Sequence, residues 1–171
     1  KLLLHNRAGL GTEEVHLNSL GLAAAAAPMV FIDENQLLLR GVKHSAGKAH
    51  TAKSLLLCDL QNTSCKPFSK QLGTLSTAGV EIHQATGWIL IADPGTSKIY
   101  KFAADGKLID QIDTSVPRKA TLRLQAGLLH MNSASAPAIS VFRPDEGAFG
   151  AQLDEILLMP SEAMELEHNT V

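Results

Sequence analysis

Aromatic residues are scarce in this chain, which has one tryptophan, one tyrosine and five phenylalanines among 171 residues. Proteins that bind single-stranded nucleic acids stack the bases on aromatic side chains, so this composition argues against that class. An excess of charge of one sign is also absent, because 15 lysines and arginines are balanced by 17 aspartates and glutamates. The net charge of −2 gives no bulk attraction to nucleic acid or to an anionic membrane.

Long hydrophobic runs are missing as well. The most apolar stretch extends from Leu20 to Ile32, contains Gly21 and Pro28, and stops at Asp33. A membrane-spanning helix needs about 20 apolar residues, so we expect no transmembrane segment in this chain. The run also begins too far into the chain to be a signal peptide. Since the first residue is lysine and not methionine, we expect either processing or a piece cut from a longer protein.

What the sequence does contain is a pattern of four short strands within residues 78–113. Alternating or continuous apolar residues mark the strands, and Gly87 and Gly106 mark two of the tight turns between them. Successive strands joined by tight turns form an antiparallel meander. The predicted strands are residues 80–83, 88–92, 97–102 and 107–112.

This pattern repeats along the chain. Its third strand begins at Ser54, Ser97 and Pro137, which are offsets of 43 and 40 residues. The repeats cover about residues 28–72, 78–113 and 119–154, with half units predicted at residues 1–17 and 160–171. In the last repeat the predicted turn is Pro144–Gly147 and the fourth strand is residues 148–153. Near-constant spacing of this kind identifies a repeat architecture.

Each repeat is a four-stranded sheet with two apolar faces, and it cannot bury both without neighbours. The sequence therefore predicts an all-β fold, in which stacked blades form a β-propeller or a partial propeller as one domain over residues 1–171. Two sheets packed as a sandwich are the alternative. A ring could be completed by a longer chain, by a homo-oligomer that shares blades, or by a four-bladed closure.

Residues 87–106 resemble a repeat of the NHL propeller family. In that family a hydrophobic strand ends in an Ala-Asp step, here Ala92-Asp93, and an Ile-containing strand follows and leads to an Asp-Gly turn, here Asp105-Gly106. The flanking repeats share the layout but have Leu39-Arg40 and Met131-Asn132 in place of the Ala-Asp step. The resemblance implies binding of proteins or RNA by a ring that usually has six blades.

Related propellers are lactonases or esterases that use a central Ca²⁺, and this is the alternative function. Such an enzyme needs oxygen ligands from several blades pointing into one channel. Asp33, Asp93 and Asn132 lie near predicted inner strands, but at non-equivalent positions. We therefore assign no catalytic residue, no metal ligand and no cofactor, and the sequence favours a non-catalytic protein over an enzyme.

The two cysteines, Cys58 and Cys65, are predicted to face each other on the third and fourth strands of the first repeat. Opposed strand residues can supply the Cα separation of about 5.5–6 Å that disulfides favour. A disulfide is favoured over two buried thiols. A zinc site is the least favoured, since zinc-binding cysteine pairs usually have two to four residues between them and here there are six. A disulfide would indicate an oxidising compartment, so we expect a periplasmic or secreted protein.

A basic segment replaces the short loop between the second and third strands of the first repeat. It contains no acidic residue, and such loops lie on a rim of a propeller. It can be a docking site for a protein partner or a small anionic ligand, or a solvated insertion without a function. The candidate binding residues are Arg40, Lys43, His44, Lys48, His50 and Lys53.

The leading hypothesis is thus a scaffolding or binding propeller outside the cytoplasm, with no nucleic acid among its expected partners. An assembly domain that docks to membrane proteins is a variant of this hypothesis.

Overall fold

The computed structural model describes residues 2–5, 12–43, 54–72, 79–83, 85–133, 138–144 and 152–157. Every regular element among them is a β-strand. No helix in this part of the chain is long and apolar enough to cross a membrane. The strands are β1 (Leu2–His5), β2 (Thr12–Val15), β3 (Leu22–Phe31), β4 (Gln36–Lys43), β5 (Ser54–Asp59), β6 (Ser64–Pro67), β7 (Gly79–His83), β8 (Trp88–Asp93), β9 (Lys98–Phe102), β10 (Leu108–Asp113), β11 (Thr121–Gln125), β12 (Leu128–Asn132), β13 (Ala138–Phe142) and β14 (Gln152–Leu157).

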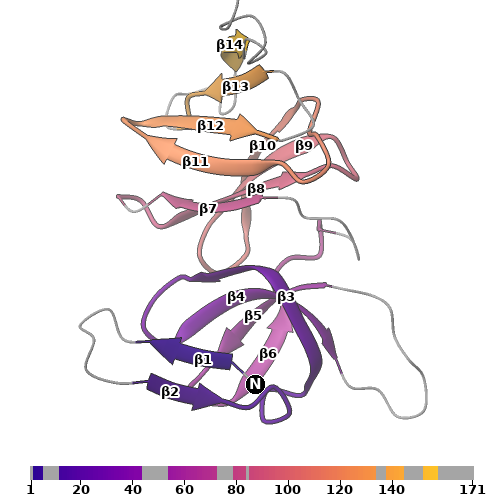
Figure 1. The fold of residues 1–171 in the computed structure, drawn as a ribbon, viewed down its shortest axis with the longest axis vertical. Coiled ribbons are helices and arrows are strands. Elements are labelled where there is room, and N and C mark those ends of the chain that lie inside the picture. The colour runs from indigo at the N-terminus through magenta and orange to yellow at the C-terminus, as the bar shows by residue number, and fades with distance from the viewer. Residues whose placement is uncertain are drawn as a thin grey trace, which may run out of the picture. The chain divides into compact units, whose positions relative to one another are not determined.

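The strands form three antiparallel meanders of four strands each, in chain order (Figure 1). One sheet holds β3 to β6, the second holds β7 to β10, and the third holds β11 to β14. A separate pair, β1 and β2, lies where the first half unit was predicted. The three sheets overlap the predicted repeats, and the half unit predicted at residues 160–171 lies outside the described residues.

Two strand boundaries differ from the prediction. β3 begins at Leu22, where the sequence pattern indicated a start at Pro28, and it pairs with β4 through two irregularities in register. The alanines before Pro28 have no β-branched or aromatic side chains, so they carry little strand signal. β14 is Gln152–Leu157 and not residues 148–153, so the connection from β13 is longer than the predicted four-residue turn.

The chain divides into two compact units, of which the first comprises residues 1–75 and 104–107. Its core covers one face of the β3–β6 sheet, where alternate residues of β4 and β5 point the same way. Val15, the last residue of β2, and Leu17, just after it, pack against this core. The buried residues of this core are Leu20, Leu22, Leu37, Leu39, Leu56 and Cys58.

The second unit comprises residues 76–103 and 108–171, and within it two sheets pack against each other. β11 lies beside β7 and β8, as Figure 1 shows, so the first strand of one sheet neighbours the first strand of the next. That is the arrangement expected of successive blades around one axis. The shared core contains Leu90, Ala92, Ile99, Val116, Ala120, Leu122, Leu129, Met131 and Phe142.

Candidate functional site

Arg40 is the candidate binding residue whose side chain the structure describes. It lies in the middle of the β3–β6 sheet, in β4, opposite Ala26 of β3 and Leu55 of β5. Its Nε atom is buried and has no hydrogen-bond partner, and no other described residue forms a hydrogen bond or ion pair with its side chain. Arg40 is thus a half-buried cation with one buried N–H donor, at Nε, that has no acceptor.

The surroundings of Arg40 are apolar. Leu55 lies directly across from it, and Leu38 and Leu57 form the next cross-strand pair on the same face. All three leucines are buried, with exposed fractions of 1–6%. Burying an unpaired polar group costs free energy, and a cationic donor costs more than a neutral one. Arg40 as a whole is half-buried, so this cost applies to its Nε–H, and an anion could supply the acceptor that the described residues do not.

The other candidate binding residues are only partly covered by the structure. Lys43 is the last residue of β4 and lies opposite Leu22 in register. His44, Lys48, His50 and Lys53 lie outside the described residues. The docking hypothesis for this segment thus stays a prediction, with Arg40 as its described starting point.

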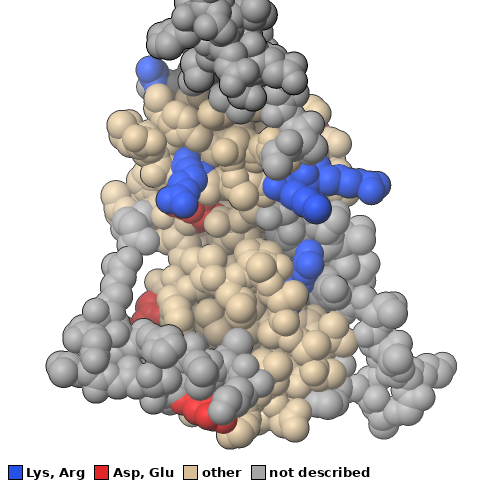
Figure 2. Space-filling view, in the orientation of Figure 1, with Lys and Arg blue, Asp and Glu red and all other residues tan. Residues whose placement is uncertain are grey.

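On the face that Figure 2 shows, the lysines and arginines among the described residues stand in separate groups, and acidic atoms lie beside one of these groups. A group such as the Arg40 side chain acts at short range, because charges beyond about 10 Å are screened at ordinary ionic strength. Recognition of an anion would thus depend on local geometry and not on a broad field.

The predicted disulfide is present. Cys58 in β5 and Cys65 in β6 are directly opposed and bonded, with their Cα atoms 4.0 Å apart. Cys58 is fully buried in the core of the first unit, and Cys65 packs against the same core. The bond thereby fixes β6, a four-residue strand at the edge of its sheet, to the neighbouring strand.

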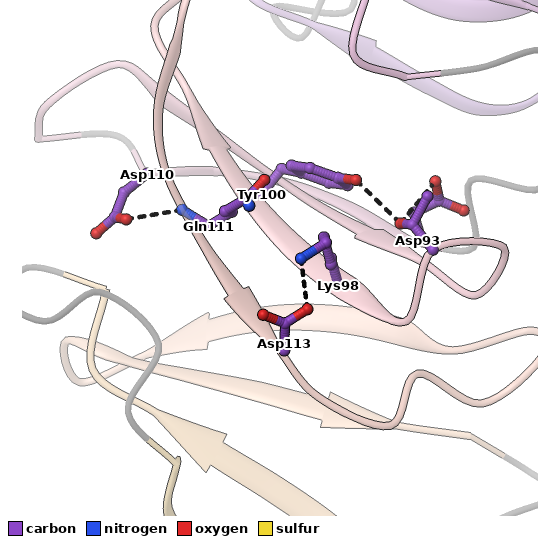
Figure 3. Close-up of polar contacts among 7 residues, drawn as sticks. Asp93, Lys98, Tyr100, Asp110, Gln111 and Asp113 are labelled. Atoms are coloured by element: carbon purple, nitrogen blue, oxygen red, sulfur yellow. Dashed lines mark hydrogen bonds and ion pairs between the residues drawn. The ribbon is translucent and has the colours of Figure 1, made fainter.

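Asp93, the acidic residue of the NHL-like step, closes the turn between β8 and β9. Its two carboxylate oxygens accept hydrogen bonds from the Gly95 backbone N–H at 2.9 Å and from the Thr96 hydroxyl at 3.1 Å. Tyr100 donates to the Thr96 hydroxyl at 3.0 Å, so the turn is anchored to β9 (Figure 3). Asp93 is 3% exposed, and its carboxylate is used within its own hairpin.

Asp33 has the equivalent role in the turn between β3 and β4. One of its oxygens accepts the backbone N–H groups of Asn35 and Gln36, at 2.8 and 2.7 Å. The third oxygen-bearing candidate, Asn132, accepts a hydrogen bond from the Thr121 hydroxyl across the β11–β12 pair. Among the residues that the structure describes, no three His, Cys, Asp or Glu side chains come together as a possible metal site.

A buried lysine is the feature that sequence reasoning missed. Lys101 of β9 is 6% exposed, and its Nζ donates to the backbone oxygen of Pro144 at 2.9 Å. The same Nζ stands 4.3 Å from the ring centroid of Trp88, the only tryptophan. Lys101 thus links the second sheet to the segment that follows β13 of the third. The sequence signal that could have indicated its burial is the position of this lysine between apolar residues in a strand.

Comparison with known proteins decides between a propeller and a sandwich. No protein-family model and no curated protein matches the sequence. Among solved structures, a structure of apo AztD from Citrobacter koseri matches with a TM-score of 0.50 and 10% identity, over 74% of this chain and 44% of that one. A crystal structure of Citrobacter koseri AztD matches with a TM-score of 0.51 and 9% identity, over 81% and 47%.

The fold is a β-propeller. The chain spans less than half the length of either AztD structure. With identities of 9–10%, the likeness extends to the propeller fold and not to a shared function. A propeller-type architecture is supported, whereas membership of the NHL family in particular stays a resemblance.

Proposed function

We propose that this propeller is a non-catalytic binding module that recognises an anionic group outside the cytoplasm. Either a small anionic ligand or an acidic side chain of a protein partner would supply that group. The observation that supports the proposal is the Arg40 side chain, which is cationic, lies among buried leucines and has no acceptor for its Nε–H. No cofactor forms part of the proposal.

The chemistry of arginine suits this role. A guanidinium group binds carboxylate or phosphate through two parallel hydrogen bonds, and it keeps its charge in an apolar environment. From Lys43 to Lys53 the sequence has three lysines and two histidines and no acidic residue that could neutralise them. This basic composition agrees with an anionic ligand or partner.

The disulfide supports a location outside the cytoplasm. Cys58 and Cys65 are the only cysteines, and both are used in the bond. Structural disulfides persist in the periplasm and in secreted proteins, whereas cytosolic thiols are kept reduced. We therefore propose that the protein is periplasmic or secreted.

Ligand-dependent thermal stabilisation tests the proposal. The probes are citrate, inorganic phosphate and an oligo-glutamate peptide, each compared with sodium chloride at matched ionic strength. A probe at ten times its Kd stabilises the folded chain by about 1.4 kcal/mol, which is measurable as a rise in Tm. We expect at least one probe to raise the Tm of the natural chain, and the pattern would separate small anions from acidic peptides.

Two variants make this test specific. Arg40→Met should abolish the rise while leaving the ligand-free chain at least as stable, because it removes an unpaired buried donor. Lys66→Met is the matched control, since Lys66 is an exposed cation in β6 of the same unit. If all probes act equally on the natural chain and on Arg40→Met, the proposal is wrong.

Two other predictions stay open to direct measurement. Calcium titration, with Tm as the readout, tests the alternative of a hydrolase with a central Ca²⁺. The mass of the protein in solution tests whether a second copy completes the ring.

A further inference from the structure

The turn between β5 and β6 contains a sequence motif that the proposed function does not use. Residues 62–64 read Asn-Thr-Ser, which is the chain's single match to the N-x-Ser/Thr pattern of N-glycosylation acceptors. Transfer of a glycan needs the hydroxyl two residues after the asparagine, and it needs the asparagine at the surface of a protein in the secretory route. Asn62 must therefore lie at the surface, and the protein must pass through such a compartment.

The turn meets the requirement for access. Asn62, Thr63 and Ser64 are all exposed, and they follow Asp59, the last residue of β5. Thr63 has a φ of 46°, which is the left-handed conformation of a tight turn. β6 is the last strand in the order of its sheet, so the turn lies at the sheet's outer end. A bulky group attached at Asn62 would leave the strand pairing of that sheet intact.

The hydrogen bonds of the Asn62 side chain in this turn are compatible with an attached glycan. Its Nδ2 donates to one oxygen of Asp59 at 2.8 Å, and its backbone N–H donates to the other oxygen at 2.9 Å. A side-chain amide has two N–H groups, and a glycan replaces one of them. The glycosylated asparagine keeps one N–H for Asp59, so the turn need not break when it carries the sugar.

We propose that Asn62 is an acceptor for an N-linked glycan in a compartment that contains an oligosaccharyltransferase. The donor class is an oligosaccharide linked through a diphosphate to a lipid. The bond between C1 of the first sugar and the diphosphate oxygen breaks, and a bond from C1 to Nδ2 of Asn62 forms. The lipid diphosphate leaves with the electron pair, and one proton of Nδ2 passes to a base. The disulfide that begins one residue after the motif agrees with passage through such a compartment.

Secretion from a eukaryotic host, with a cleavable leader before the chain, tests this proposal. We expect the intact mass of the secreted protein to exceed the sequence mass by a glycan that peptide N-glycosidase F removes. The enzyme leaves aspartate in place of Asn62, which identifies the site by peptide mapping. Asn62→Gln and Ser64→Ala should both lack the glycan, whereas Ser64→Thr should keep it because it retains the hydroxyl.

Cell-free translation with microsomes is the second measurement, and it depends on neither folding nor export from a cell. A mobility shift that disappears in Ser64→Ala would support the proposal. The proposal is overturned if the natural chain shows no glycan in the secreted protein and no shift with microsomes.

Discussion

The buried Lys101 gives a prediction whose size can be worked out from the structure. Its ammonium group donates to the Pro144 oxygen and stands over the Trp88 ring. A hydrogen bond from a charged donor contributes about 1.5–3 kcal/mol, and a cation–π contact contributes about 0.5–2 kcal/mol. Lys101→Met removes both and leaves the carbonyl unpaired, but it also removes the cost of burying the charge. We expect a net loss of about 1–3 kcal/mol.

Lys101→Ala separates the charge from the packing of its stem. Compared with methionine, alanine lacks a methylene, the sulfur and the terminal methyl group, and a buried group of this size contributes about 0.8 kcal/mol. The free energy of unfolding of this variant should therefore be about 2 kcal/mol lower than that of Lys101→Met. The matched control is Lys98→Met on the same strand, since Lys98 pairs with the exposed Asp113 (Figure 3). Surface pairs contribute about 0–1 kcal/mol, so this control should change little.

Urea unfolding followed by circular dichroism measures these differences, and Trp88 supplies a local readout. As the only tryptophan, it reports on the neighbourhood of Lys101 without interference. The native emission spectrum should shift in Lys101→Met and stay unchanged in Lys98→Met. The reasoning would be refuted if Lys101→Met and Lys98→Met had equal stabilities and the emission of Lys101→Met matched that of the natural chain.

Three further predictions follow from the turns and the disulfide. Replacing Cys58 and Cys65 together by alanine opens a loop with a sequence separation of 7, and it should cost about 2.5 kcal/mol or more in urea unfolding; no loss would contradict a structural bond. The backbone and side-chain hydrogen bonds from Asn62 lower the pKa of Asp59. Because the folded pKa is depressed, the associated stability is present above the unfolded pKa and is lost as the pH falls through the folded pKa. Asn62→Ala keeps the backbone N–H, which is the larger cause, and removes the side-chain donor, so it should raise the pKa of Asp59 only part of the way in an NMR titration; an unchanged pKa would contradict the side-chain contribution. Asp93→Ala leaves the Gly95 N–H without its acceptor and should cost about 1–3 kcal/mol, whereas Asp93→Asn should cost less because one acceptor oxygen remains.

Local patterns were sufficient to predict the strands and most of the turns. Alternating apolar residues and glycine-marked turns placed β7 to β10 within a few residues of their observed bounds. The same reasoning placed Cys58 opposite Cys65, because two strands joined by a short turn fix which residues face each other. These features depend on backbone preferences over a few residues, which the sequence carries directly.

The start of β3 and the position of β14 were harder to predict. The alanines of β3 are held in the strand by pairing with β4, and that pairing is a contact between separate segments of the chain. The sequence from Ala23 to Ala27 has no such information in its own composition. Tertiary pairing overrides weak local preference, so strand ends depend on the partner strand.

The amino-acid sequence alone indicated the repeat, the four-strand layout and the facing positions of the two cysteines, because strand period, turn chemistry and spacing are local properties. Only the tertiary structure decided which polar groups are buried and what they contact. Asp33 and Asp93 resembled possible ligands in the sequence, but their oxygens close their own turns. The burial of Lys101 between two sheets was not predicted. Arg40 was already a candidate binding residue, and the structure adds that its neighbours on the facing strand are buried leucines. Burial depends on which strands and sheets pack together, and that is a property of the whole fold.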